Sequence, residues 1–189
     1  MGGAAPIGGG VVSEDNAHVI PPLVDLTLER EATAFLHHEA QLQDERAFRA
    51  WLRLLDPAIR YRVPVRVTLP EGQGPEHSDV MFHFDETLET LEMRVARLHS
   101  GDAWAEVPPS RTRHFVSNVR VAPGDTPDCL RVRSNLLFVR IRGDEVVAQS
   151  LTAERHDVLR RADGTWRLLD RLVLLDATTL PTYNLAFFL

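Results

Sequence analysis

The sequence predicts an α+β fold: a curved antiparallel β-sheet, shaped like a cone or roll, with three helices from the N-terminal half packed on its concave face. Two observations lead to this expectation. In the N-terminal half, apolar residues mostly recur every three or four positions, as in amphipathic helices. From residue 111 onward they recur every second position, which is typical of half-buried strands. Helices followed by consecutive strands favour an α+β arrangement over alternating parallel units.

Two helices are expected first. Thr27 can act as an N-cap, and an apolar stripe continues through residues 27–42. Asp44 is the expected N-cap of a second helix over residues 44–55. That helix ends before Pro57, because the residue preceding a proline disfavours helical backbone.

A strand, a loop and a third helix follow. Residues 59–66 alternate between apolar and polar, and Pro64 within them indicates an edge strand or a bulge. Glycine and proline make residues 70–84 loop-like. A third apolar stripe predicts a helix over residues 85–98, with Gly101 as the stop.

The second half predicts four long strands joined by turns. The strands are residues 112–121, 130–142, 145–161 and 165–176. Gly143-Asp144 and Asp163-Gly164 are the expected hairpin turns.

The chain divides into a tail and one domain. Five of the 11 glycines fall in the first ten positions, so residues 1–17 are expected to be a disordered tail. Residues 18–189 are expected to form a single domain, because the remaining length suits one core of ordinary size.

The composition excludes several classes of protein. The 27 acidic and 21 basic residues give a net charge of −6, which argues against a nucleic-acid-binding surface. No apolar run is long enough to span a membrane. One cysteine, Cys129, rules out a disulfide framework and a cluster or zinc site held by cysteines of this chain alone. Every basic residue is arginine, so a lysine Schiff base is impossible.

Proton transfer is the chemistry with most support among the side chains. His114 shares a face of its expected strand with Val116, Asn118 and Arg120, opposite Val119 and Val121. Asp170 falls among Trp166, Leu168, Leu172 and Leu174 on one face of the last strand. If the sheet curls into a cone, His114 and Asp170 can act as acid and base, with Tyr61 beside them. Alternatively, Asp170 pairs with an arginine and His114 satisfies a buried main-chain group. The histidines show no HExxH spacing, so no metal site is predicted.

Three segments, in order, resemble the β subunits of aromatic-ring-hydroxylating dioxygenases. Residues 51–66 read WLRLLDPAIRYRVPVR and residues 104–121 read WAEVPPSRTRHFVSNVRV. The end of the chain, GTWRLLDRLVLLD followed by NLAFFL, resembles the last strand and the aromatic tail of that family. One departure is Ala153-Glu154-Arg155, where the family often has a glycine-arginine step, so strand pairing there is in doubt.

The resemblance implies a fold and a partner. The fold would be SnoaL-like, of the nuclear-transport-factor-two-like superfamily, and cystatin-like in outline. The chain would be a structural, non-catalytic and cytoplasmic subunit, forming a β–β trimer beneath three α chains in an α3β3 assembly that dihydroxylates an aromatic compound. The Rieske 2Fe-2S cluster and mononuclear iron would lie on the α chain, with no cofactor, nucleic acid or membrane bound here. The candidate interface or scaffold residues are Tyr61, Arg62, Trp104, Arg111, Arg113, Arg171, Phe187 and Phe188.

Two other functions stay open. The same superfamily contains stand-alone dehydratases and isomerases, for which His114 and Asp170 would be the acid and base and Tyr61 would polarise a carbonyl. A self-associating protein with no reaction of its own is the third possibility. An open pocket holding all three side chains would favour the enzyme, and a filled pocket would favour the subunit.

Overall fold

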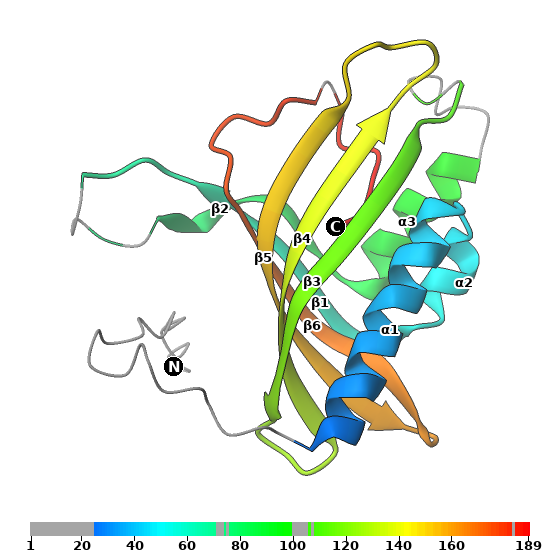
Figure 1. The fold of residues 1–189 in the computed structure, drawn as a ribbon, viewed down its shortest axis with the longest axis vertical. Coiled ribbons are helices and arrows are strands. Elements are labelled where there is room, and N and C mark those ends of the chain that lie inside the picture. The colour runs from blue at the N-terminus through cyan, green and yellow to red at the C-terminus, as the bar shows by residue number, and fades with distance from the viewer. Residues whose placement is uncertain (1–24, 71–73, 75, 100–105, 107, 183) are drawn as a thin grey trace.

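Six strands in one sheet, with helices on one side of it, make up the described part of the chain (Figure 1). The computed structural model describes residues 25–70, 74, 76–99, 106, 108–182 and 184–189. The predicted tail, residues 1–17, lies outside the described residues. The α+β class and the curved sheet are therefore as predicted.

The sheet is mixed rather than wholly antiparallel, which corrects the prediction. Its strand order is β2-β1-β6-β5-β4-β3, and β1 runs parallel to β6 while every other neighbouring pair is antiparallel. In the parallel pair, the first strand of the chain lies next to the last one. The strands are β1 (Leu55–Arg66), β2 (His77–Glu86), β3 (Arg111–Pro123), β4 (Cys129–Ile141), β5 (Gln149–Ala162) and β6 (Thr165–Leu175).

The helices begin and end differently from the prediction. They are α1 (Leu26–Asp44), α2 (Phe48–Leu52) and α3 (Leu88–His99). The N-cap of α1 is Asp25, whose Oδ1 accepts a hydrogen bond from the Thr27 main-chain N at 2.8 Å. Asp44 closes α1 instead of capping a second long helix, because its carboxylate binds residues of β3. The second helix is therefore a single short segment of five residues.

The predicted loop at residues 70–84 is wrong for its second half, which forms β2. This strand lies at the sheet edge and leaves most of its side chains half-exposed or exposed, so it has no alternating apolar pattern. Asp85 pairs with Arg62 in the strand, which delays the start of α3 to Leu88. The predicted irregularity at Pro64 is confirmed, because the β1–β2 register shifts on both sides of it.

Two bulges change which face the side chains occupy. In β3 the register shifts between Ser117 and Arg120, and Asn118 takes a φ of 52°. Val121 is consequently buried on the same face as Phe138 of the neighbouring strand, and Arg120 is exposed. The expected face combining His114 with Asn118 and Arg120 is therefore wrong beyond residue 117.

The bulge in β6 has the same effect. Leu168 pairs with Leu159 and Asp170 pairs with Val158, so Leu169 is the extra residue. Leu168 and Arg171 are both fully buried, although strict alternation would place them on opposite faces. Asp170 is thereby turned away from the interior, which corrects the expected apolar face of the last strand.

Of the two predicted hairpins, one is as short as expected. Asp163 and Gly164 join β5 to β6 with φ values of 52° and 77°, which suits a tight hairpin turn. The connection from β4 to β5 is longer, since β5 begins at Gln149 rather than at residue 145. Pairing between β4 and β5 continues without a register shift through Ala153-Glu154-Arg155, so the departure noted there leaves the sheet intact.

The core lies between the concave face of the sheet and the helices. The C-terminal end of the chain lies within this curve, beside the strands (Figure 1). Trp51, Tyr61, Phe138 and Phe188 are at most 1% exposed there. Three arginines are also among the largest fully buried side chains, namely Arg140, Arg155 and Arg171. Buried guanidinium groups require paired carboxylates, so acidic partners are expected in the interior as well.

Candidate functional site

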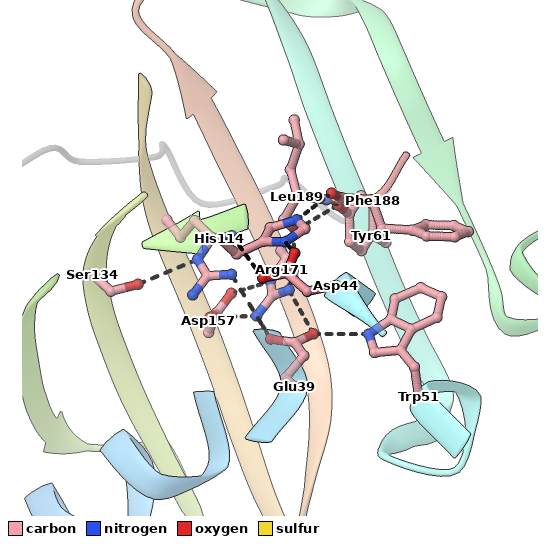
Figure 2. Close-up of polar contacts among 11 residues, drawn as sticks. Glu39, Asp44, Trp51, Tyr61, His114, Ser134, Asp157, Arg171, Phe188 and Leu189 are labelled. Carbon is pink, nitrogen blue, oxygen red and sulfur yellow. Dashed lines mark hydrogen bonds and ion pairs between the residues drawn. The ribbon is translucent and has the colours of Figure 1, made fainter. Parts of the chain in front are cut away.

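Arg171 of β6 is the centre of a buried network of charged side chains (Figure 2). Its Nε and Nη2 donate to the two carboxylate oxygens of Asp157 on β5, at 2.8 and 2.9 Å. Its Nη1 and Nη2 donate to the two oxygens of Glu39 on α1, both at 2.7 Å. Two bidentate pairs on one guanidinium fix its plane and join the sheet to α1. These carboxylates raise the pKa of Arg171 despite its burial, so it is permanently charged.

Glu39 has a further hydrogen-bond donor and a second cation beside it, from two other elements. Trp51 Nε1 donates to it at 3.0 Å, and Arg155 Nη1 lies 3.8 Å from its Oε2. Burial alone would raise the pKa of Glu39, but Arg171 and Arg155 outweigh it and the pKa lies below its usual value. The carboxylates of Glu39 and Asp157 thus balance two arginines in the interior.

Arg155 is the second cation of this network. Its Nε donates to Ser134 Oγ at 3.3 Å, across the β4–β5 pair. Burial lowers the pKa of Arg155, and neighbouring Arg171 lowers it further. Two adjacent guanidinium groups are tolerated here because the shared carboxylates lie between them.

Tyr61 of β1 holds the last residue of the sequence. Its hydroxyl donates to the main-chain oxygen of Leu189 at 2.6 Å and accepts from the Leu189 main-chain N at 2.7 Å. Burial raises the pKa of Tyr61, so the phenol stays protonated and able to donate. Both hydrogen-bonding capacities of the hydroxyl are used within the chain.

His114 of β3 joins α1 to the same C-terminal residues (Figure 2). Its Nδ1 lies 2.6 Å from Asp44 Oδ1, and its Nε2 lies 3.0 Å from the main-chain oxygen of Phe188. Thr112 Oγ1 also donates to Asp44, at 3.0 Å. Burial would raise the pKa of Asp44, but the hydrogen bonds from His114 and Thr112 hold it below its usual value. Both ring nitrogens of His114 therefore have partners within the chain.

Asp170 lies on the opposite face of the sheet from these groups. Arg62 Nη2 donates to its two oxygens at 2.9 and 3.0 Å. Burial raises the pKa of Asp170, although Arg62 opposes the shift. Its neighbour Arg171 points inward, so Asp170 points outward. The structure brings Tyr61 and His114 together around the C-terminal residues, but it does not bring Asp170 to them.

The C-terminal residues fill the space inside the sheet. The Phe188 ring packs against Trp51 and Phe48 with centroid distances of 4.3 and 5.4 Å, and Phe187 stacks on Phe138 at 4.7 Å. The cavity that remains beside them measures about 10 Å³, which is the size of one water molecule. A site for an organic substrate needs several hundred Å³, so the space left beside these rings by the described residues is too small for one.

The described residues contain no group of three or more His, Cys, Asp or Glu side chains that could hold a metal ion. No helix within these residues is long and apolar enough to cross a bilayer. The interior residues instead neutralise one another and bind main-chain groups of the C-terminal segment. Chemically, this arrangement can hold a peptide segment in place.

The remaining predicted site residues divide between the interior and the surface. Phe187, Phe188 and Arg171 are buried. Arg111 and Arg113 are exposed on the outer face of β3, where they donate to the main-chain oxygens of Gly143 and Thr112. Trp104 lies outside the described residues.

Sequence reasoning missed the carboxylates that make the network. Glu39 lies on the apolar stripe of α1, three residues after the buried Leu36, and this position was a signal for a buried charge. Asp157 and Arg155 likewise share the buried face of β5 with Leu151, Ala153 and Leu159. Glu106 pairs with the buried Arg140, and no pattern in the sequence connects these two.

Comparison with known proteins decides the family. The model of the ring hydroxylating beta subunit family matches residues 38–182, most of the chain. The chain belongs to this family. The β-subunit resemblance is thereby confirmed, and the subunit is the non-catalytic one of an oxidoreductase complex, binding neither the Rieske cluster nor the iron.

Solved structures agree with this assignment. A chain of naphthalene 1,2-dioxygenase, solved with indole bound in the active site, is 29% identical with a TM-score of 0.80, and the match covers 89% of both chains. The β subunit of benzoate 1,2-dioxygenase from Burkholderia mallei is 23% identical with a TM-score of 0.64, covering 82% of this chain and 92% of that one.

The fold is also shared with a putative scytalone dehydratase from Novosphingobium aromaticivorans. That match is 15% identical with a TM-score of 0.60, and covers 84% of this chain and 91% of the other. At this identity only the fold is shown. It confirms the expected SnoaL-like architecture of this β subunit.

Proposed function

We propose that this β subunit is a structural support for an α chain that carries a Rieske cluster and a mononuclear iron, in an enzyme that adds both atoms of O₂ to an aromatic ring. The observation that carries the proposal is the filled interior. The C-terminal phenylalanines occupy the space inside the sheet and leave about 10 Å³. With the space inside the sheet filled in this way among the described residues, the subunit is expected to contribute through its surfaces.

The proposed assembly is α3β3 in the cytoplasm, with three β subunits contacting one another. The similarity to a chain of naphthalene 1,2-dioxygenase supports an aromatic substrate and an α partner. Trp104 belongs to the proposed contact by its place in the family-like segment. The other buried or half-buried candidates would act indirectly, by keeping the sheet rigid; they are Tyr61, Arg62, Arg171, Phe187 and Phe188.

The outer face of β3 is the proposed contact surface. Arg111, Arg113 and Arg120 are exposed there, and no carboxylate of the described residues forms an ion pair with them. Phe115, 55% exposed, lies between them and pairs across the sheet with the exposed Leu137. Unpaired cations around an aromatic side chain suit a partner surface that carries carboxylates and apolar groups.

Co-purification tests the proposal. The β subunit is co-expressed with its α chain, and the mass of the complex is measured by native mass spectrometry. We expect an α3β3 complex, and a β trimer when the subunit is isolated. Failure of the two chains to co-purify, with full activity of the α chain alone, would overturn the proposal.

A charge reversal locates the contact. Arg113→Glu is expected to weaken the complex about tenfold or more, because it places a carboxylate against an acidic partner. Arg53→Glu is the matched control, since Arg53 is exposed just after α2 on the helical side, where it donates to the Arg49 main-chain oxygen. Equal effects of the two variants would argue against β3 as the contact.

A further inference from the structure

The last six described residues, Asn184–Leu189, lie inside the protein as a segment without helix or strand structure. We call them the C-terminal segment. Phe187, Phe188 and Leu189 are at most 4% exposed. Buried main chain outside regular structure still requires hydrogen-bond partners, such as side chains. The identity of those partners shows how the segment is held.

The first half of the segment is bound by two arginines from different elements. Arg94 of α3 donates through Nη2 to the main-chain oxygens of Leu185 and Phe187, at 3.0 and 2.9 Å. Arg140 of β4 donates through Nη1 to the oxygen of Asn184 at 3.3 Å. Asn184 Nδ2 in turn donates to Glu106, at 3.3 Å.

The second half is bound by three more side chains (Figure 2). His114 Nε2 lies 3.0 Å from the oxygen of Phe188. Tyr61 and Arg171 both donate to the oxygen of Leu189, at 2.6 and 3.1 Å. The main-chain N of Leu189 donates back to the Tyr61 hydroxyl at 2.7 Å. The main-chain oxygens of residues 184, 185, 187, 188 and 189 therefore all have side-chain donors from the body of the protein.

The two phenylalanine rings occupy separate aromatic pockets. Phe188 packs on Trp51 and Phe48 of α2, with the Arg94 guanidinium 4.7 Å from its ring centre. Phe187 stacks on Phe138 of β4, on the sheet side. Main-chain contacts hold an extended peptide of any sequence, whereas such pockets select its side chains.

We propose that the space between the sheet and the helices is a peptide-binding cleft, and that the C-terminal segment is its ligand, supplied by the same chain. The ligand class is an extended apolar peptide with two adjacent aromatic side chains. The preceding residues Thr178, Thr179 and Pro181 are exposed, so the segment is joined to the sheet by a surface connection. That connection keeps the ligand at a high effective concentration, and cutting it converts the contact into bimolecular binding.

The test cuts the connection in the full chain. A protease recognition sequence is inserted between Thr178 and Thr179, and the folded protein is cleaved there. We expect the fragment to remain bound through gel filtration. We also expect a fluorescently labelled synthetic peptide of residues 179–189 to exchange into the cleaved protein, with a thermal midpoint that rises with peptide concentration.

Peptide variants test the pockets. A peptide with alanine in place of both phenylalanines is expected to bind on the order of a hundredfold more weakly, because each ring fills an aromatic pocket. A Tyr61→Phe protein is expected to bind the natural peptide about tenfold more weakly, since it lacks the hydroxyl that contacts Leu189. Arg53→Ala is the control and should bind it normally.

If the cleaved protein unfolds, adding the peptides still tests the proposed cleft. Refolding on addition of the natural peptide, but not of the double-alanine peptide, would support the cleft. Release of the fragment with no rebinding at millimolar peptide, whether the remainder stays folded or not, would overturn it. Equal affinity for both peptides would also overturn it. The readout is peptide affinity, so it is independent of whether an α chain binds the subunit.

Discussion

Arginine–carboxylate pairs inside the sheet and on its outer face differ in what they do. Arg171 is 0% exposed and shares two carboxylates. Arg131, on the outer face, lies 3.4 Å from Asp125, and their side chains are 60% and 92% exposed. Removing one partner of a buried pair leaves an uncompensated charge, whereas water screens an exposed pair. The interior pairs therefore fix the fold, and the outer arginines remain available to a partner.

Replacing the central cation should have the largest effect on stability. Arg171→Met leaves Glu39 and Asp157 buried without their main partner. We expect a loss of about 3–5 kcal/mol in the free energy of unfolding, measured by urea denaturation. A loss below about 1 kcal/mol would mean that water enters the interior and solvates the carboxylates.

Truncating the buried aromatic tail should rank next. Phe188→Ala empties the pocket formed by Trp51 and Phe48. We expect a loss of about 3 kcal/mol in the free energy of unfolding, from lost burial plus the cavity left behind. Phe115→Ala, on the exposed outer face, is the matched control and should change it by less than about 0.5 kcal/mol.

Acid should weaken the contacts of the interior carboxylates. Glu39 and Asp44 have pKa values below their usual range. Their contribution to stability is present above the unfolded-state pKa values, near 4, and is lost as the pH falls through the lower folded-state values. Urea midpoints measured from about pH 6 to pH 3 should therefore fall with acid. The urea midpoint should fall less steeply with pH in Asp44→Asn. An unchanged pH dependence would contradict the contribution of the Asp44 carboxylate to stability.

Asp170 should behave in the opposite sense. Its pKa is raised by burial, so its ionised form is disfavoured in the folded protein and protonation on acidification restores stability. Asp170→Asn should therefore change the free energy of unfolding at neutral pH by only about 1 kcal/mol or less, because removing the disfavoured charge offsets the loss of the partly exposed pair with Arg62. A loss equal to that of Arg171→Met would show that Asp170 belongs to the interior network.

The outer pair should have the smallest effect. Arg131→Ala removes an exposed ion pair and should change the free energy of unfolding by about 0.5 kcal/mol or less. The measurement is the same urea titration, repeated at high salt. A larger loss, or one that salt does not reduce, would show that the outer face is organised as tightly as the interior.

Much of the second half could be predicted from the sequence because its signals are local. The alternation over residues 130–142 matches β4 to within one residue at each end, and the Asp163-Gly164 turn lies where expected. The β2 strand could not be predicted, since an exposed edge strand needs no apolar alternation. Its existence depends on hydrogen bonds from β1, which are non-local.

The candidate site shows the same division between local and non-local information. The recurrence of apolar residues at every second position placed His114 and Asp170 on strands correctly. However, the bulges at Asn118 and Leu169 decide which face of the sheet the later residues occupy. A single extra residue reverses the facing of all that follow it. Asp170 was turned outward in this way, and its neighbour Arg171 was turned inward.

Residue patterns alone were enough to predict the α+β class, the strand-rich second half and, through three ordered segments, the resemblance to a dioxygenase β subunit. The filling of the interior, and the pairing of the charges within it, became visible only in the folded chain. Glu39, Asp157 and Arg171 come from α1, β5 and β6, and Leu189 is 128 residues from the Tyr61 that holds it. Such contacts arise from folding, because no local spacing relates residues that meet only when distant elements pack.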